Sequence, residues 1–253
     1  MTSPPFFILG CVRSGTTMLR DLLRSVPDLC CPEETHFYRW AHPFATPQFK
    51  HQYVHNKVLA KHRELDGVTD DDIAKLFHNT KSRAEFFDGY MQRFIAAQGL
   101  PPETRWFDKT PQNVFGAHLL GFDYPDSKFV HLYRNPRNVV ASLKKGVVMH
   151  VENPVAGANY WRESELMAAS FERANPGRML SVSYRELTND PRTHLDAICS
   201  FIDIAPLADD VVATVSPEKD GYAEVLDERE VALVDEICRP AIAELGYVFS
   251  SGR

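Results

Sequence analysis

The sequence has few cysteines, no long apolar run and no excess of positive charge. Its five cysteines are an odd number and include no C-x-x-C pair, which disfavours a disulfide scaffold and favours a cytoplasmic protein with reduced thiols. No stretch approaches the roughly 20 apolar residues of a membrane span, and the apolar run 6–10 is too short for a secretory signal. The net charge of −6 argues against a nucleic-acid-binding protein.

A compact set of metal ligands is also missing from the sequence. Six histidines gather in the first third of the chain, at His36, His42, His51, His55, His62 and His78. Their spacings match no compact ligand set, so we assign them surface and packing roles and predict no metal site. The hydrophobic content of 44% and charged content of 25% over 253 residues are those of a soluble globular enzyme.

The stretch 6–26 joins an apolar run to a helix through a loop that contains glycine. The run 6–10 predicts a buried strand, and leucines spaced three and four apart predict a helix after Gly15. A strand, such a loop and a helix N-terminus form an anion site, because backbone N–H groups and the helix dipole converge there. A Walker A loop has Lys where Thr16 stands, and here the positive charge is Arg13 instead. The stretch therefore predicts a phosphate cradle without the Walker lysine.

Short apolar strands and helical stretches alternate along the rest of the chain. Further strands are predicted at 29–31, 105–108, 128–133 and 179–184, and helices at 114–120, 138–145, 159–172, from 190 and at 228–245. This alternation predicts an α/β fold, with a central parallel sheet and helices on both faces in a three-layer, P-loop-like arrangement. We expect one domain over residues 1–253, which is long enough to bury a sizeable core.

Residues 37–98 differ from this alternating pattern. Aromatic residues, histidines and helix formers dominate there, and Thr69 with Asp72 predicts the capped start of an amphipathic helix. A second helix is predicted over 84–97. We interpret this stretch as a helical insertion that covers the sheet edge and supplies an acceptor pocket.

Polar residues follow several of the predicted strands. Glu33 and Glu34 follow the strand at 29–31, Lys109 follows the strand at 105–108, and Arg134 follows the strand at 128–133. In an open α/β sheet, ligands bind at the carboxyl ends of the strands. A helix also begins just after Arg134 and carries Ser142, which predicts a second anion site.

Two motifs, in this order along the chain, resemble those of the sulfotransferases that use 3′-phosphoadenosine 5′-phosphosulfate (PAPS). They are R-S-G-T-T at residues 13–17, and Y-R-N-P-R at residues 133–137 together with Ser142. The E-E-T of residues 33–35 and the D-K-T-P of residues 108–111 extend the resemblance. This resemblance is greater to the tyrosylprotein sulfotransferases, to other Golgi-type members and to bacterial members than to the cytosolic steroid and phenol enzymes. The resemblance implies transfer of a sulfonate group from PAPS to a hydroxyl acceptor, giving PAP and a sulfate ester, with no metal.

The resemblance also assigns roles to individual residues. It implies that Glu34 is the catalytic base, and that Lys109 and Arg13 neutralise charge on the bridging oxygen of the donor. The implied donor-binding residues are Arg13, Ser14, Gly15, Thr16, Thr17, Arg134, Ser142, Tyr184 and Lys219. Catalysis would then depend on positioning and electrostatic stabilisation, as in phosphoryl transfer.

Several assignments stay open on the sequence alone. Glu33, His36 or His118 could replace Glu34 as base, and Lys219 could be a solvated charge. The C-terminal Arg-Lys-Gly segment of the cytosolic branch is missing, and only Lys144 and Lys145 approximate a basic residue beyond Ser142. These departures leave the contacts to the 3′-phosphate less defined than those to the 5′-phosphate.

Two other functions compete with sulfonate transfer. A P-loop kinase or nucleotidase with a degenerate Walker A loop would need an acidic residue after an apolar strand, but the strand at 128–133 is followed by Arg134. A catalytically inactive binding module would use the same pocket. The acceptor, a small molecule or a glycan or peptide hydroxyl, and the oligomeric state are not defined by the sequence.

Overall fold

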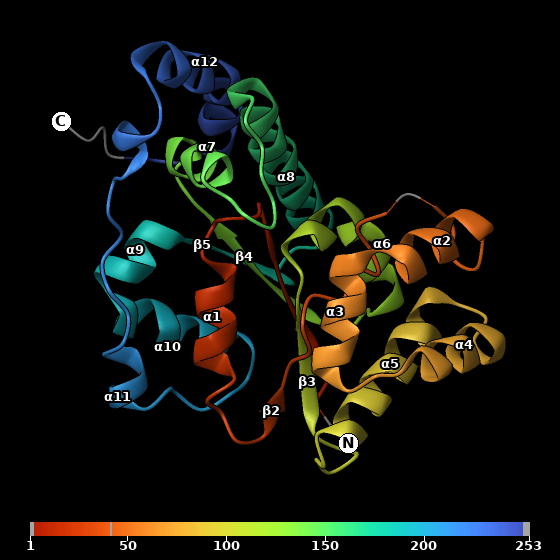
Figure 1. Ribbon diagram of the computed structural model, residues 1–253. Coiled ribbons are helices and arrows are strands. Elements are labelled where there is room, and N and C mark those ends of the chain that lie inside the picture. The colour runs from red at the N-terminus through yellow and green to blue at the C-terminus, as the bar shows by residue number, and fades with distance from the viewer. Residues whose placement is uncertain (1–2, 41, 250–253) are drawn as a thin grey trace.

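A computed structural model describes residues 3–40 and 42–249 (Figure 1). Its strands are β1 (Phe6–Gly10), β2 (Leu29–Cys30), β3 (Arg105–Lys109), β4 (Lys128–Tyr133) and β5 (Met179–Ser183). They form one parallel sheet in the order β2-β3-β1-β4-β5. The predicted α/β fold with a central parallel sheet is confirmed.

The helices account for most of the remaining chain. They are α1 (Thr16–Leu23), α2 (Pro47–His55), α3 (Lys57–Asp66), α4 (Asp70–Asn79), α5 (Arg83–Ala97), α6 (Ala117–Asp123), α7 (Pro136–Lys144), α8 (Pro154–Ala174), α9 (Tyr184–Asn189), α10 (Pro191–Phe201), α11 (Asp209–Val212) and α12 (Glu228–Leu245). Two 3₁₀ segments, η1 (Pro111–Gly116) and η2 (Tyr222–Glu224), complete the set.

The central strand β1 is buried on both faces, as its uninterrupted apolar sequence predicts. Phe6 and Ile8 pack in a core with α1, α9 and α10, whereas Phe7 and Leu9 pack in a core with α5, α6 and α8. Alternate side chains of one strand point to opposite faces of a sheet, so β1 contributes to both cores. A third cluster joins α7, α8 and α12, which lie together at one end of the molecule (Figure 1).

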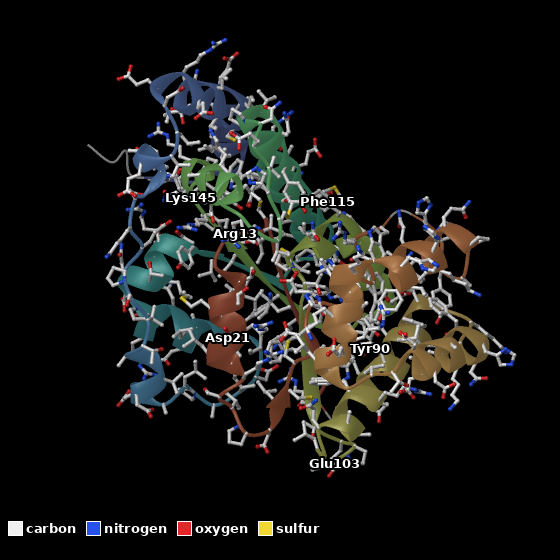
Figure 2. All side chains as sticks on the ribbon, viewed as in Figure 1. Arg13, Asp21, Tyr90, Glu103, Phe115 and Lys145 are labelled. Carbon is white, nitrogen blue, oxygen red and sulfur yellow. The ribbon has the colours of Figure 1, made fainter. Side chains whose placement is uncertain are left out.

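The helices α2 to α5 lie between β2 and β3 in the chain and group on one side of the sheet (Figure 1). Each begins at a side-chain cap, and Thr69 and Asp72 form the reciprocal capping box expected from the sequence. Aromatic rings, among them Tyr90, fill the core of this group (Figure 2). The aromatic residues of this stretch therefore serve mainly in packing.

Several helix boundaries differ from those predicted. The helix predicted from residue 159 starts at Pro154, because Asn153 caps it and proline is favoured at the first helical position. Tyr184, predicted as the end of a strand, begins α9 behind the N-cap Ser183. The helix predicted at 114–120 is divided between η1 and α6.

Because the strands are parallel, their carboxyl ends meet at one edge of the sheet. The loops that follow β1, β2, β3 and β4 all start from this edge. Arg13, in the loop after β1, lies near the middle of the molecule, whereas Glu103, just before β3, lies at its periphery (Figure 2). Over residues 3–40 and 42–249, no helix is long and apolar enough to cross a membrane.

Candidate active site

A cavity of about 650 Å³ opens at the carboxyl edge of the sheet. Its wall includes eight of the residues predicted to act in catalysis or donor binding, namely Arg13, Gly15, Thr16, Thr17, Glu34, Lys109, Arg134 and Ser142. These residues come from the loop after β1 and the start of α1, the loop after β2, the end of β3, and the segment from the end of β4 through α7. The fold therefore assembles most of the predicted site in one place.

The loop after β1 has a backbone suited to an anion. Arg13 and Gly15 both have positive φ values, 69° and 90°, and Gly15 is the N-cap of α1. No side chain caps this helix, so the amides of its first turn keep their hydrogen-bonding capacity for a ligand. A Cβ at Gly15 would come 2.2 Å from the ring of Tyr184, so both φ and the neighbouring ring require glycine here.

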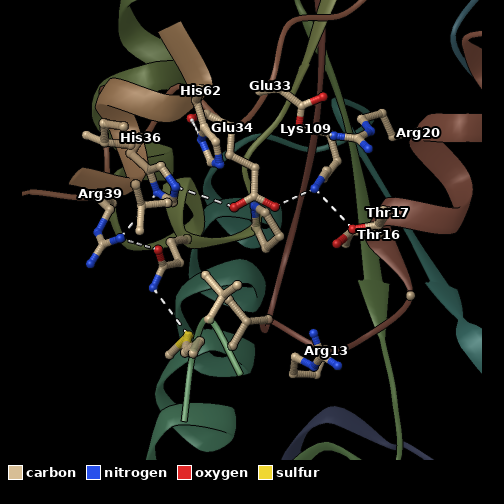
Figure 3. A pocket seen from close by; sticks show the side chains of 18 of the residues that line it. Arg13, Thr16, Thr17, Arg20, Glu33, Glu34, His36, Arg39, His62 and Lys109 are labelled. Atoms are coloured by element: carbon tan, nitrogen blue, oxygen red, sulfur yellow. Dashed lines mark hydrogen bonds and ion pairs between the residues drawn. The ribbon is translucent and has the colours of Figure 1, made fainter. Parts of the chain in front are cut away.

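Glu34 lies between two nitrogen donors (Figure 3). Lys109 Nζ donates to Glu34 Oε1 and also to Thr17 Oγ1 at 3.2 Å, while His36 Nε2 lies 3.4 Å from Glu34 Oε2. Burial alone would raise the pKa of Glu34, but the hydrogen bond from His36 and the charge of Lys109 lower that pKa to about 2. Glu34 is therefore ionised at neutral pH, and Lys109 links it to the loop after β1.

His36 is held tightly beside Glu34. Its backbone has a φ of 57°, and its ring stacks with that of Trp40 at 6.5 Å and with that of His62 at 6.1 Å between ring centres. Arg39 Nη1 lies 3.3 Å from His36 Nδ1, which must then be the acceptor and leaves Nε2–H facing Glu34. Burial lowers the pKa of His36, although Glu34 opposes this effect, so the ring donates to Glu34 as a neutral imidazole.

A buried carboxyl group supports the residues around Glu34 and Lys109. Asp108 accepts hydrogen bonds from Thr35 (2.9 Å), Thr110 (3.0 Å) and Asn113 (3.1 Å). Burial raises the pKa of Asp108 to about 6, against the lowering effect of the two threonine hydroxyls. The Thr35 amide also donates to Thr110 Oγ1 at 2.9 Å. These bonds fasten the loop carrying Glu34 to the end of β3, where Lys109 lies.

The two predicted anion sites are contiguous. Arg13 Nε donates to Ser142 Oγ at 2.8 Å, and Arg134 Nη1 donates to the Arg13 carbonyl at 3.0 Å. The Arg134 guanidinium lies 4.9 Å from the centre of the Tyr184 ring. The loop after β1 and the segment from Arg134 through α7 therefore form one continuous basic wall of the cavity.

Three predicted donor-binding residues do not line the cavity. Ser14 is fully buried, and its hydroxyl has no hydrogen-bond partner among the described residues. The ring of Tyr184 packs against Arg134 and Gly15 but is not part of the cavity wall. Lys219 is exposed, and no ion pair or side-chain hydrogen bond of Lys219 is found in the described part of the chain.

Two of the alternative bases, Glu33 and His118, are poorly placed for catalysis: one is held in ion pairs and the other lies outside the cavity wall. Glu33 lines the cavity, but it pairs with Arg20 at 2.8 Å and Arg24 at 3.2 Å. His118 is exposed on α6, where its ring lies 3.2 Å from Ser170 Oγ, and it is not part of the cavity wall. Of the four candidates, Glu34 is the one that contacts Lys109 within the cavity, and His36 lines the cavity on the opposite side of Glu34.

Other cavity residues were not predicted. Arg39 lies on the side of Glu34 opposite Lys109 (Figure 3) and donates to Gln112 Oε1. No carboxylate lies within ion-pair distance of Arg39 among the residues that the structure describes. His62 reaches the cavity from α3 and donates through Nδ1 to the Glu34 carbonyl at 2.9 Å. The sequence feature that could have indicated Arg39 is a basic residue five positions after Glu34. No sequence feature indicated that His62 would reach the cavity.

The comparisons agree with this geometry. A model described as the sulfotransferase family matches residues 4–209. The chain belongs to the sulfotransferase family. It is 27% identical over 213 residues to a Caenorhabditis briggsae protein named for protein-tyrosine sulfotransferase activity, covering 78% of this chain and 65% of the relative. It is also 27% identical to protein-tyrosine sulfotransferase 2 of Gallus gallus, covering 80% of this chain and 52% of the relative.

Solved structures show the same fold. The sulfotransferase domain of the olefin synthase from Synechococcus PCC 7002 superposes with a TM-score of 0.69 and 21% identity, covering 98% of this chain and 96% of that domain. A mouse sulfotransferase solved in complex with PAP superposes with a TM-score of 0.52 and 12% identity, covering 96% and 85%. The predicted P-loop-like sulfotransferase fold is thereby confirmed. The chain spans about two thirds or less of the length of the curated relatives named above.

Proposed function

We propose that this sulfotransferase takes its sulfonate group from PAPS and transfers it to a hydroxyl acceptor. The observation that carries the proposal is the contiguous basic wall formed by Arg13, Arg134 and Ser142, with Lys109 between that wall and a carboxylate. PAPS carries a phosphosulfate at its 5′ end and a phosphate at its 3′ position, so it requires neighbouring anion sites for its two ends. The name of the mouse structural neighbour, which was solved with PAP, supports the same donor.

The residues at the cavity fit such a donor. The uncapped first turn of α1 offers backbone amides for the 5′-phosphate, with the hydroxyls of Thr16 and Thr17 beside them. Arg134 and Ser142 would hold the 3′-phosphate, because a planar guanidinium suits a phosphate. Within residues 3–40 and 42–249, no group of three or more His, Cys, Asp or Glu side chains could hold a metal ion.

Glu34 would accept the proton of the acceptor hydroxyl. Both of its oxygens have partners, Lys109 at Oε1 and His36 at Oε2, so the carboxylate is well oriented but weakly basic. Lys109 also contacts Thr17 and would stabilise charge on the donor's bridging oxygen. A weak base accepts its proton late, as the hydroxyl attacks.

The acceptor would enter on the other side of Glu34. Arg39 lies on that side (Figure 3), and the cavity wall also includes the polar residues Asn56 and His62 and the apolar residues Val58, Leu59 and Met149. A hydroxyl of a small molecule, glycan or peptide is compatible with this lining. The names of the curated relatives make a peptide tyrosine one acceptor to test.

Thermal-shift titration tests the donor. PAP without Mg²⁺ should raise the melting temperature in a saturable way, whereas ATP with Mg²⁺ should not. Equal stabilisation by both, or none by PAP, would contradict the proposal. Equal stabilisation would instead favour the kinase or nucleotidase, an alternative that none of the comparisons supports.

The cytoplasmic location predicted from the sequence is also a proposal. All five cysteines are unpaired and buried, which suits a compartment that keeps thiols reduced. Fractionation of the source cells with an antibody to the protein would test it.

A further inference from the structure

Glu218 is a buried carboxylate to which the proposed function assigns no role. It lies between α11 and η2, and its side chain is 1% exposed. Arg134 Nε pairs with Glu218 Oε1 at 2.5 Å, and Asn138 Nδ2 donates to the same oxygen at 2.9 Å. The backbone amide of Glu218 donates to Thr188 Oγ1 at 3.1 Å. The residue is therefore held at once by groups from the loop after β4, from α7 and from α9.

These contacts fix the guanidinium of Arg134 on three sides. Nε is paired with Glu218, Nη1 donates to the Arg13 carbonyl, and the plane lies over the Tyr184 ring. Among the described residues, Nη2 has no hydrogen-bond partner, and Arg134 lines the cavity. A long arginine side chain otherwise loses considerable rotamer entropy when it binds a ligand. Here much of that entropy is already lost before the ligand arrives.

A second arginine, Arg185, and a second carboxylate, Asp220, complete the charged cluster around Glu218. Asp220 accepts from Asn138 at 3.0 Å and pairs with Arg185, whose Nε also lies 3.5 Å from Glu218 Oε2. Two arginines thus face two carboxylates. Glu218 Oε1 accepts from two donors, whereas Oε2 has no hydrogen-bond partner among the described residues and faces Arg185 at 3.5 Å. Because breaking a buried ion pair is costly, we treat Glu218 as a fixed support and not as a group that an entering phosphate displaces.

Resting on the proposed function, we propose that Glu218 is a positioning residue for the donor's 3′-phosphate. By holding Nε of Arg134, it presents the other edge of the guanidinium to the cavity and thereby sets the preference for nucleotides with a 3′-phosphate. The effect acts through Arg134, so it should leave the 5′-phosphate site unchanged. AMP, which has the 5′-phosphate of PAP but no 3′-phosphate, is the matched probe.

Isothermal titration calorimetry with PAP and with AMP tests this role. Glu218→Ala removes the oxygen that accepts from Arg134, and should raise the Kd for PAP at least about tenfold while changing the Kd for AMP less than about threefold. Glu218→Gln keeps an oxygen for Arg134 Nε and Asn138, and should restore the PAP affinity to within about threefold of wild type. Glu224→Ala is the control, since Glu224 is 80% exposed and its ion pair is with Lys145 at 3.9 Å.

The outcomes separate this inference from the proposed function. If wild type binds PAP more tightly than AMP, the donor assignment stands and the variants alone test Glu218. Tighter PAP binding by Glu218→Ala would overturn the inference, because Glu218 would then compete with the phosphate. Equal weakening of PAP and AMP would overturn it as well, because Glu218 would then act only in folding.

A second variant covers the case in which Glu218→Ala does not fold. Asn138→Ala removes one of the donors that hold Glu218, and leaves the ion pair with Arg134 in place. It should weaken PAP binding by a smaller factor, about threefold to fivefold, again without changing AMP binding. An unchanged ratio of the PAP and AMP affinities in Asn138→Ala would count against the role of this network.

Discussion

The two sides of the cavity to which we assign the donor and the acceptor are built differently. On the donor side, Arg13, Lys109 and Arg134 follow directly from the ends of neighbouring strands, and they are tied together by bonds between their own loops. On the acceptor side, Arg39 and His62 come from the stretch between β2 and β3, which has its own helices and aromatic core. The sheet therefore fixes the proposed donor site, while the insertion can vary the proposed acceptor site without disturbing it.

The largest expected effect is at Glu34, where the two sides meet. Glu34→Gln should lower the rate of sulfonate transfer by about 10²- to 10⁴-fold, because the general base is lost. PAP binding should persist, since the basic wall is unchanged. The measurement is transfer from ³⁵S-labelled PAPS together with calorimetry of PAP. Wild-type activity in this variant would reject Glu34 as base and return His36 to consideration.

Arg39 tests whether the acceptor side is independent of the donor side. Arg39→Gln should raise the KM for the acceptor by about tenfold, as expected for one lost charged hydrogen bond, and leave the Kd for PAP unchanged. The assay uses whichever hydroxyl compound a mass-spectrometric sulfation screen identifies. If the Kd for PAP changed by the same factor as the KM, the two sides would not be separable.

The acidity of Glu34 gives a smaller effect on stability. Its pKa is lowered from an ordinary 4.5 to about 2, so the folded state favours the ionised form. The resulting stabilisation is present above about pH 4.5 and is lost as the pH falls towards 2. Urea unfolding from pH 7 to pH 3 should therefore show a steeper loss of stability in wild type than in Glu34→Gln. Parallel curves would mean that Glu34 is not held by Lys109 and His36.

The smallest effect is expected at Lys219, which neighbours Glu218 in sequence but is exposed. Lys219→Ala should change the Kd for PAP by less than about twofold, because an exposed side chain in water contributes little. Isothermal titration calorimetry of PAP with Lys219→Ala and with Glu218→Ala under the same conditions compares the two neighbouring residues directly. A loss of tenfold or more would show that Lys219 binds the donor, as the resemblance to the family implies.

Much of the donor side could be predicted from the sequence, because its residues follow strand ends. Parallel strands place Arg13, Lys109 and Arg134 at one edge once the strands are recognised. Arg39 could not be assigned in this way, since its position depends on how the insertion packs. Glu218 gave no signal either, because it meets Arg134 across 84 positions of the chain. Contacts of that kind follow from tertiary packing and not from local pattern.

A crystal structure of the protein with PAP tests the central claim most directly. We predict the 5′-phosphate at the first turn of α1 beside Thr16 and Thr17, and the 3′-phosphate on Arg134 and Ser142, with no metal ion between them. A nucleotide bound outside this cavity, or one whose 3′-phosphate points away from Arg134, would contradict the account.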